Sequence, residues 1–177
     1  NIDKNKKLLA QEYINKGFRN VKVTEHIEND SVIKNAVNVT FNVERGPKVK
    51  IGAITFSGND NVPEKRLRRA MKKTKQKSIN IFKSTKLNTE DYKEDKNLLV
   101  DFYNSRGYRN ATILSDSIYD INEKRIGIHL NISEGNKFYI RNVNWVGNSV
   151  YDTEDLQRIF STKPGDTYDK KSMHKQL

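Results

Sequence analysis

Strict alternation of apolar and polar residues over 126–133 predicts a β-strand with one face in a core. The residues between the apolar ones, including His129, are expected to face solvent. Before it, residues 111–119 predict a partner strand, joined through a turn at 120–124. The same alternation over 37–43 predicts another strand with an apolar face. The apolar positions of the two alternating strands are Val37, Val39, Phe41 and Val43, and Ile126, Ile128, Leu130 and Ile132.

Residues 48–57 predict a strand that ends at a Gly58-Asn59 turn. Its apolar phase slips between Ile51 and Ile54, which a β-bulge would explain. A helix follows over 63–73, with Pro63 suited to its first position, N1.

A second helix is predicted over 89–106, after a loop over 74–88. Asn88 or Thr89 would cap its start, and Gly107 would stop it in the left-handed conformation. Three acidic residues of this helix alternate with lysines, and we interpret them as a solvated face: Asp91, Glu94 and Asp95. A shorter helix is predicted over 153–161, capped by Asp152 or Thr153.

The chain repeats itself with a period of about 89 residues. Residues 8–21 return as 98–111, with these identities: Leu8, Leu9, Tyr13, Gly17, Arg19 and Asn20 correspond to Leu98, Leu99, Tyr103, Gly107, Arg109 and Asn110. Residues 44–59 return as 133–148, with one residue fewer between the two matches. The corresponding apolar positions are Val49, Ile51, Ile54 and Phe56 in the first copy and Phe138, Ile140, Val143 and Trp145 in the second.

The repeat predicts the domain organisation. Residues 47–135 form one complete β-α-α-β-β repeat, residues 1–46 match the C-terminal half of a repeat, and residues 136–177 match the N-terminal half. Alternating strands with helices on one face predict an α+β fold, in which each repeat is a three-stranded mixed sheet packed on two helices. Such a sheet has two edges, to which another extended chain can add.

Net charge is concentrated in one segment. Ten basic residues and one acidic residue lie between Pro63 and Leu87, so this segment carries +9 of the net +11. We name the following residues the basic patch: Lys65, Arg66, Arg68, Arg69, Lys72, Lys73, Lys75 and Lys77. The patch is either a solvated helix face with a lysine-rich loop, or a surface that binds phosphates of nucleic acid or anionic lipid. Only Phe82 lies within the run, whereas nucleic-acid modules usually interleave several aromatic residues.

No constellation for catalysis is found. The chain has no cysteine, which excludes disulfides, thiolate zinc sites and thiol nucleophiles. His26, His129 and His174 lie in separate elements without metal-ligand spacing, and no phosphate-binding glycine loop or nucleophile elbow occurs. No apolar run approaches the length of a membrane-spanning helix. We therefore expect neither an enzyme nor a metal or cofactor site.

These residues resemble POTRA domains, the β-α-α-β-β periplasmic repeats of the BamA family of outer-membrane assembly proteins. The resemblance rests on I-x-x-I-x-F-x-G-N at 51–59 with its copy at 140–148, on F-Y-N-S-R-G-Y-R-N-A at 102–111, and on S-E-G-N at 133–136. These motifs recur in tandem over nearly the whole chain. The Lys- and Asn-rich composition is similar to that of Bacteroidetes members.

The resemblance implies a periplasmic, non-catalytic scaffold, attached to the outer membrane through a β-barrel of the parent chain. It implies as partners unfolded outer-membrane proteins and accessory lipoproteins of the BAM complex, bound by β-strand addition, and it implies no nucleic acid. The strand after the second helix would be the receiving edge: Ala111, Thr112, Ile113, Leu114, Ser115, Asp116, Ser117 and Ile118. In the first half-repeat the equivalent is about 21–28. The basic loop 74–88, with Ile79, Ile81 and Phe82, receives no role from the family.

The two half-repeats add up to one whole repeat. Each half alone would expose an apolar face, and our hypothesis is that two chains pair residues 1–46 of one with 137–177 of the other into hybrid domains, a form of domain swapping. A monomer at high concentration would contradict this hypothesis.

Overall fold

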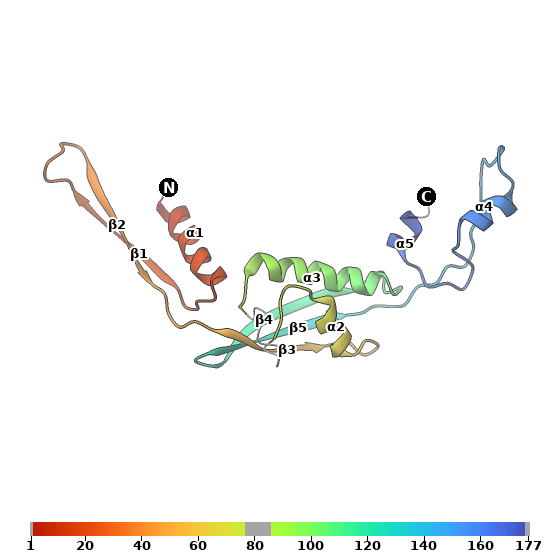
Figure 1. The fold of residues 1–177 in the computed structure, drawn as a ribbon, viewed down its shortest axis with the longest axis horizontal. Helices are drawn as coiled ribbons and strands as arrows, with labels where there is room; N and C mark the ends of the chain where they lie inside the picture. The colour runs from red at the N-terminus through yellow and green to blue at the C-terminus, as the bar shows by residue number, and fades with distance from the viewer. Residues whose placement is uncertain (1, 77–85, 176–177) are drawn as a thin grey trace. The chain divides into compact units, whose positions relative to one another are not determined.

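The computed structural model describes residues 2–76 and 86–175 (Figure 1). Its elements in chain order are α1 Ile2–Asn15, β1 Lys22–Asn29, β2 Val37–Glu44, β3 Lys50–Ser57, α2 Glu64–Ala70, α3 Thr89–Asn104, β4 Thr112–Asn122, β5 Arg125–Ser133, α4 Thr153–Ile159 and α5 Lys170–His174. Within the described ranges, no helix is long and apolar enough to cross a membrane.

The chain divides into two compact units. The first comprises residues 1–55, 72–95 and 117–129, and the second comprises 56–71, 96–116 and 130–177. The boundaries at 46/47 and 135/136, which the sequence repeat suggests, stay a prediction.

The central sheet has the strand order β3-β5-β4. Thr55 Oγ1 donates to the Ile128 carbonyl oxygen at 3.4 Å, and Ser57 Oγ donates to Asn131 Oδ1 at 3.2 Å. Because both residue numbers rise together along the pair, β3 and β5 run parallel. β4 and β5 are joined by a tight turn, so the sheet is mixed and the predicted α+β class is confirmed.

Each unit has its own buried side chains. In the first unit they include Ile126 and Ile128 of β5, and in the second Leu130 and Ile132. All four are at most 3% exposed, so the predicted inner face of this strand is confirmed. Their buried companions are Val49, Ile51, Ile54, Leu87 and Tyr92 in the first unit, and Phe56, Leu67, Met71, Leu99 and Tyr103 in the second. Ile51, Ile54 and Phe56 are all buried, so the predicted slip in the apolar alternation along β3 is confirmed.

β1 and β2 form a separate antiparallel pair, in register from Lys22 opposite Glu44 to Asn29 opposite Val37. The alternation of β2 produces an apolar face, and that face is exposed: Val37 is 56% exposed, Val39 41% and Phe41 36%. α1 has no buried residue.

Helix ends follow the sequence signals, with four corrections, one of which is that α4 ends at Ile159 rather than 161. Asn88 Oδ1 accepts from Asp91 N at 3.0 Å, and Gly107 has a φ of 88°, as predicted for the two ends of α3. However, the helical residues of α3 stop at Asn104 rather than 106. Pro63 is the N-cap of α2 rather than N1. α2 ends at Ala70 rather than 73, because the following N–H groups bond to a side chain of α3, described below.

Candidate edge-strand site

β4 lies at one edge of the central sheet and β3 at the other. Seven of the eight predicted edge residues, 112–118, lie in β4, whereas Ala111 precedes the strand and is 7% exposed. Leu114 is 61% exposed, while Ile113 and Ile118 are half-buried. The predicted receiving strand is therefore an exposed edge strand, though slightly shifted.

The β3 edge is covered by side chains of the same chain. Ile54 N donates to Gln76 Oε1 at 3.0 Å, and two residues later Phe56 N donates to Glu64 Oε1 at 3.3 Å. Residues two apart on a strand point their N–H groups to the same side. These side chains therefore occupy donors that an added strand would need.

The corresponding side-chain contact on β4 lies toward its C-terminal end. Arg19 Nη2 donates to the Ile118 carbonyl oxygen at 3.5 Å, and Arg19 Nε lies 2.6 Å from Asp120 Oδ1. Asp116 is ion-paired with Lys96 at 3.0 Å. Arg19 belongs to the first half-repeat, so a side chain of the neighbouring repeat contacts the backbone near the C-terminal end of the exposed edge.

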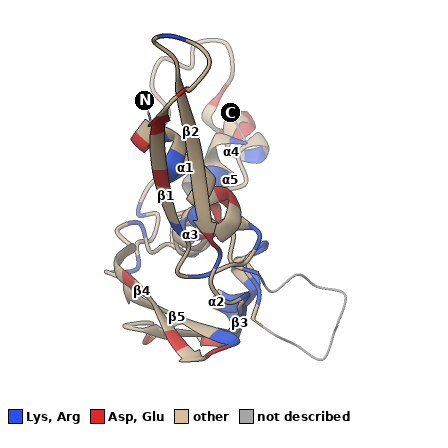
Figure 2. Cartoon of the chain, turned by 90° about the vertical axis from the view of Figure 1, so that its left-hand side faces the viewer, with Lys and Arg blue, Asp and Glu red and all other residues tan. Residues whose placement is uncertain are grey.

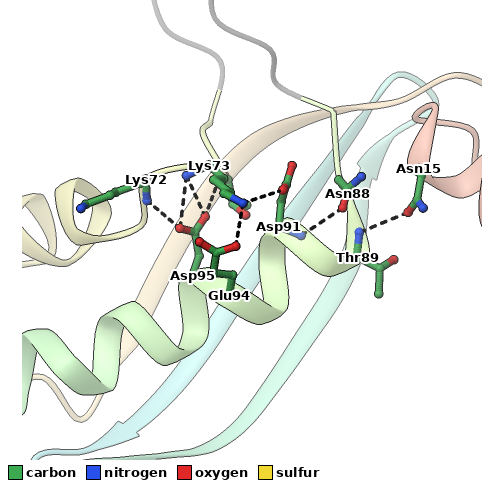
Figure 3. A network of polar contacts seen from close by, with 9 residues as sticks. Asn15, Lys72, Lys73, Asn88, Thr89, Asp91, Glu94 and Asp95 are labelled. Atoms are coloured by element: carbon green, nitrogen blue, oxygen red, sulfur yellow. Dashed lines mark hydrogen bonds and ion pairs between the residues drawn. The ribbon is translucent and has the colours of Figure 1, made fainter.

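Asp95 of α3 is fully buried, and its carboxylate lies against the backbone that follows α2 (Figure 3). It accepts from Lys72 N at 2.6 Å, from Lys73 N at 3.1 Å and from Thr74 N. Its interpretation as part of a solvated face is therefore wrong, because tertiary packing places it against three backbone donors. Its neighbour Glu94 matches that interpretation better: it is exposed and pairs with Lys73 Nζ at 2.6 Å.

Glu134 is a second buried carboxylate, 5% exposed. It accepts from Asn61 N at 2.9 Å, from Val62 N at 3.2 Å and from Tyr103 Oη at 3.0 Å. Burial, together with the hydrogen bond to Glu134, raises the pKa of Tyr103 well above its ordinary value. The S-E-G-N motif thus ties the end of β5 to α3 and to the turn before α2.

The basic patch is divided between the two units. Four members lie on α2: Lys65, Arg66, Arg68 and Arg69. Three lie in the following segment: Lys72, Lys73 and Lys75. Lys77 lies outside the described residues, as do Ile79, Ile81 and Phe82. Arg68 pairs with Glu64, and Lys73 pairs with Asp91 and Glu94.

Arg106 adds to the charge beside α2, although it lies far from the patch in sequence. The charge of Arg66 acts on Arg106, and together with burial, the larger cause, it lowers the pKa of Arg106. Sequence analysis missed Arg106, because only its position after α3 brings it there. Figure 2 shows Lys and Arg positions clustered at α2.

An equivalent backbone hydrogen bond forms at each of the two junctions between repeats. Gly17 O accepts from Val49 N at 2.8 Å, and at the equivalent positions Gly107 O accepts from Phe138 N at 2.9 Å. The carbonyl of the helix-terminating glycine therefore meets the first strand region of the following repeat in both cases.

Among the described residues, no group of three or more His, Asp or Glu side chains could hold a metal ion. His129, expected to face solvent, is half-buried, with its Nδ1 3.0 Å from Thr55 Oγ1.

Comparison with known proteins relates the chain to one family. Residues 49–135 and 138–177 match the POTRA family model, described as "Surface antigen variable number repeat". The chain is 27% identical over 169 residues to the outer membrane protein assembly factor BamA of Neisseria meningitidis, covering 93% of this chain and 21% of that protein. It is 24% identical over 164 residues to a putative outer membrane protein assembly factor of Treponema pallidum, covering 89% and 19%.

The crystal structure of Haemophilus influenzae BamA POTRA3-5 has a similar fold, with a TM-score of 0.52 at 19% identity, covering 99% of this chain and 66% of that one. The chain spans about a fifth of the length of the curated relatives it matches.

Proposed function

The chain belongs to the POTRA family, and on that premise we propose that it is a periplasmic, non-catalytic scaffold of an outer-membrane protein assembly factor. The similarity to assembly factors of Neisseria meningitidis and Treponema pallidum supports this role. Its partners are then unfolded outer-membrane proteins and accessory proteins of the assembly complex, and it is attached to the outer membrane.

The receiving site is the edge of β4, at Thr112–Ile118. The observation that carries this proposal is the difference between the two sheet edges: Gln76 and Glu64 occupy successive same-side donors of β3, whereas the Arg19 contact on β4 lies at Ile118. Main-chain hydrogen bonds supply affinity without requiring one sequence, which suits a protein that binds many unfolded clients.

An NMR titration tests strand addition. The probe is an eight-residue peptide of alternating apolar and polar residues, titrated into the 15N-labelled chain. We expect amide shifts along residues 112–118 that persist at high salt, because strand addition releases few counterions. Shifts confined to β3, or no binding of the peptide, would contradict the proposal.

A backbone-blocked peptide is the matched control. The same peptide N-methylated at alternate residues on its bonding edge keeps its side chains but loses its donors, so we expect binding to fall below detection. On the protein, Leu114→Pro and Ser115→Pro each remove a backbone N–H, and only the one whose N–H points outward should weaken binding without unfolding the hairpin. Equal binding of the methylated peptide would mean that side chains, rather than backbone pairing, hold the client.

Self-association through the half-repeats is a second proposed interaction. The apolar face of β2 is exposed, and β2 pairs with β1 alone in the described part of the chain. Residues 137–177 of a second copy match the first strand and helix of a repeat, with Leu156 at the position of the buried Leu67. Light scattering over a rising concentration series checks this: a constant monomer mass would contradict it.

A further inference from the structure

α2 carries positive charge that the described part of the chain leaves without a partner carboxylate. Lys65, Arg66 and Arg69 are exposed, and none of them lies within ion-pair distance of an acidic group among residues 2–76 and 86–175. Arg68, on the same helix, differs because Glu64 neutralises it one turn away. Of the four basic residues on α2, Arg68 is therefore the one with a carboxylate partner in the described part of the chain.

Arg106, in the same compact unit as this helix, is held in a fixed position by Phe102 of α3. Its guanidinium lies 3.6 Å from the centroid of the Phe102 ring, and its Nη1 donates to the Phe102 carbonyl oxygen at 3.1 Å. Burial and, after it, the charge of Arg66 lower the pKa of Arg106. A guanidinium fixed in advance loses little entropy on binding an anion, and a bound anion also offsets the repulsion between like charges.

The surroundings favour a carboxylate partner over nucleic acid or lipid. The face of Phe102 is covered by Arg106, so it offers no free ring for base stacking. Leu67 of α2 and Met71, the residue after it, are 0% exposed, so the helix has no large apolar side chain to insert into a bilayer. Lys65 and Arg69 are four residues apart, a spacing of about 6 Å that matches two acidic residues one turn apart on a partner helix.

We propose that Lys65, Arg66, Arg69 and Arg106 form a docking surface for a carboxylate-rich segment of a protein partner. We name these four residues the α2 cationic surface. All four lie in the second compact unit. The surface is distinct from the β4 edge, so one chain can hold an extended client by its backbone and an acidic partner by its charge.

Fluorescence anisotropy with a labelled hexaglutamate peptide tests the proposal on the whole chain. We expect binding that weakens as salt rises, with NMR shifts at α2 and at Arg106. The double variant Arg66→Gln with Arg106→Gln should weaken binding about tenfold, the effect of losing two charge-assisted contacts. The matched control, Arg141→Gln with Arg158→Gln, removes the same charge from exposed arginines elsewhere and should change binding less than twofold.

Three outcomes would overturn the proposal. Equal weakening in both double variants would mean that only net charge matters. Tighter binding to a hexathymidylate oligonucleotide than to hexaglutamate would assign the surface to nucleic acid, and binding to phosphatidylglycerol vesicles without peptide binding would assign it to lipid. The Arg66→Lys with Arg106→Lys variant keeps the charge and the fold, and it should lose part of the affinity because lysine cannot bind a carboxylate through two parallel bonds. Binding of strand peptides at β4 should be unchanged in all of these arginine variants. A failure of the acidic-partner proposal can therefore be told apart from a failure of the proposed strand addition.

Discussion

Two hairpins of this molecule have the same hydrophobic pattern and opposite burial. In β5, Ile128 is 0% exposed, whereas Val39, its counterpart 89 residues earlier in β2, is 41% exposed. β5 is the middle strand of a three-stranded sheet, with β3 beside it, while β2 pairs with β1 alone. An alternating strand thus acquires an apolar face from its own sequence, but that face becomes a core only when a third strand and the helices supply the other side.

Buried polar groups differ between the repeats in the same way. Asp95 and Tyr103 of α3 are at most 1% exposed and hydrogen-bonded to segments far away in sequence. Their counterparts 90 residues earlier, Asn5 and Tyr13, lie on α1, which has no buried residue. The repeat therefore provides matched positions, buried in one copy and not in the other, for substitutions at these residues.

The largest expected difference is at the paired strand positions. Ile128→Ala should lower the free energy of opening of the β4–β5 hairpin by about 2–5 kcal/mol, because it deletes fully buried methyl groups and leaves a cavity. Val39→Ala should lower that of the β1–β2 hairpin by less than about 1 kcal/mol, since the side chain is already partly in water. Amide hydrogen exchange measures both hairpins separately. Equal losses would mean that the β2 face is covered in solution.

The next difference is at the paired helix positions. Asp95→Ala removes the acceptor of three N–H groups after α2, of which that of Thr74 is buried, and this should cost about 1–3 kcal/mol. Asn5→Ala, on the exposed surface of α1, should change stability by less than about 0.5 kcal/mol. Urea unfolding followed by circular dichroism compares the two variants. A neutral Asp95→Ala would show that water replaces the carboxylate.

The smallest difference is at the paired tyrosines and depends on pH. Tyr103→Phe removes the hydrogen bond to Glu134 and should cost about 1 kcal/mol at neutral pH, whereas Tyr13→Phe should cost almost nothing. Because the pKa of Tyr103 is raised above 10.0 in the folded state, its neutral phenol favours folding. That contribution is complete below pH 10 and is lost as the pH rises above it.

Thermal unfolding at pH 8, 10 and 11 measures this dependence. The gap in stability between the native chain and the Tyr103→Phe variant should narrow as the pH rises. A gap that widens instead would reverse the assigned direction of the pKa shift.

Local signals in the sequence predicted most element types and several of their ends. Gly107 adopts a positive φ after α3, Asn88 caps its start, and Asp152 caps α4 by accepting from Asp155 N. Each of these features involves partners within a few residues, so a short window of sequence contains all the information. The end of α2 at Ala70 was not predictable in this way, because its acceptor, Asp95, comes from another helix.

The candidate edge site was predictable only in part. The strand itself follows from its apolar pattern and from the resemblance to the POTRA family. The difference between the two edges does not, since it depends on Gln76 and Glu64 reaching back to β3 and on Arg19 reaching β4 from 99 residues away. Arg106, which completes the α2 cationic surface, was missed for the same reason.

By itself, the sequence determined the repeat, the order of the elements and the face of each strand that is apolar. These properties depend on side-chain periodicity and on turn residues, which act over a few bonds. Only the tertiary structure decided which apolar faces become cores, which carboxylates are buried and which sheet edge stays open. Each of those outcomes requires two segments distant in the chain to meet, and their burial and hydrogen bonds offset the cost of desolvation only when they do.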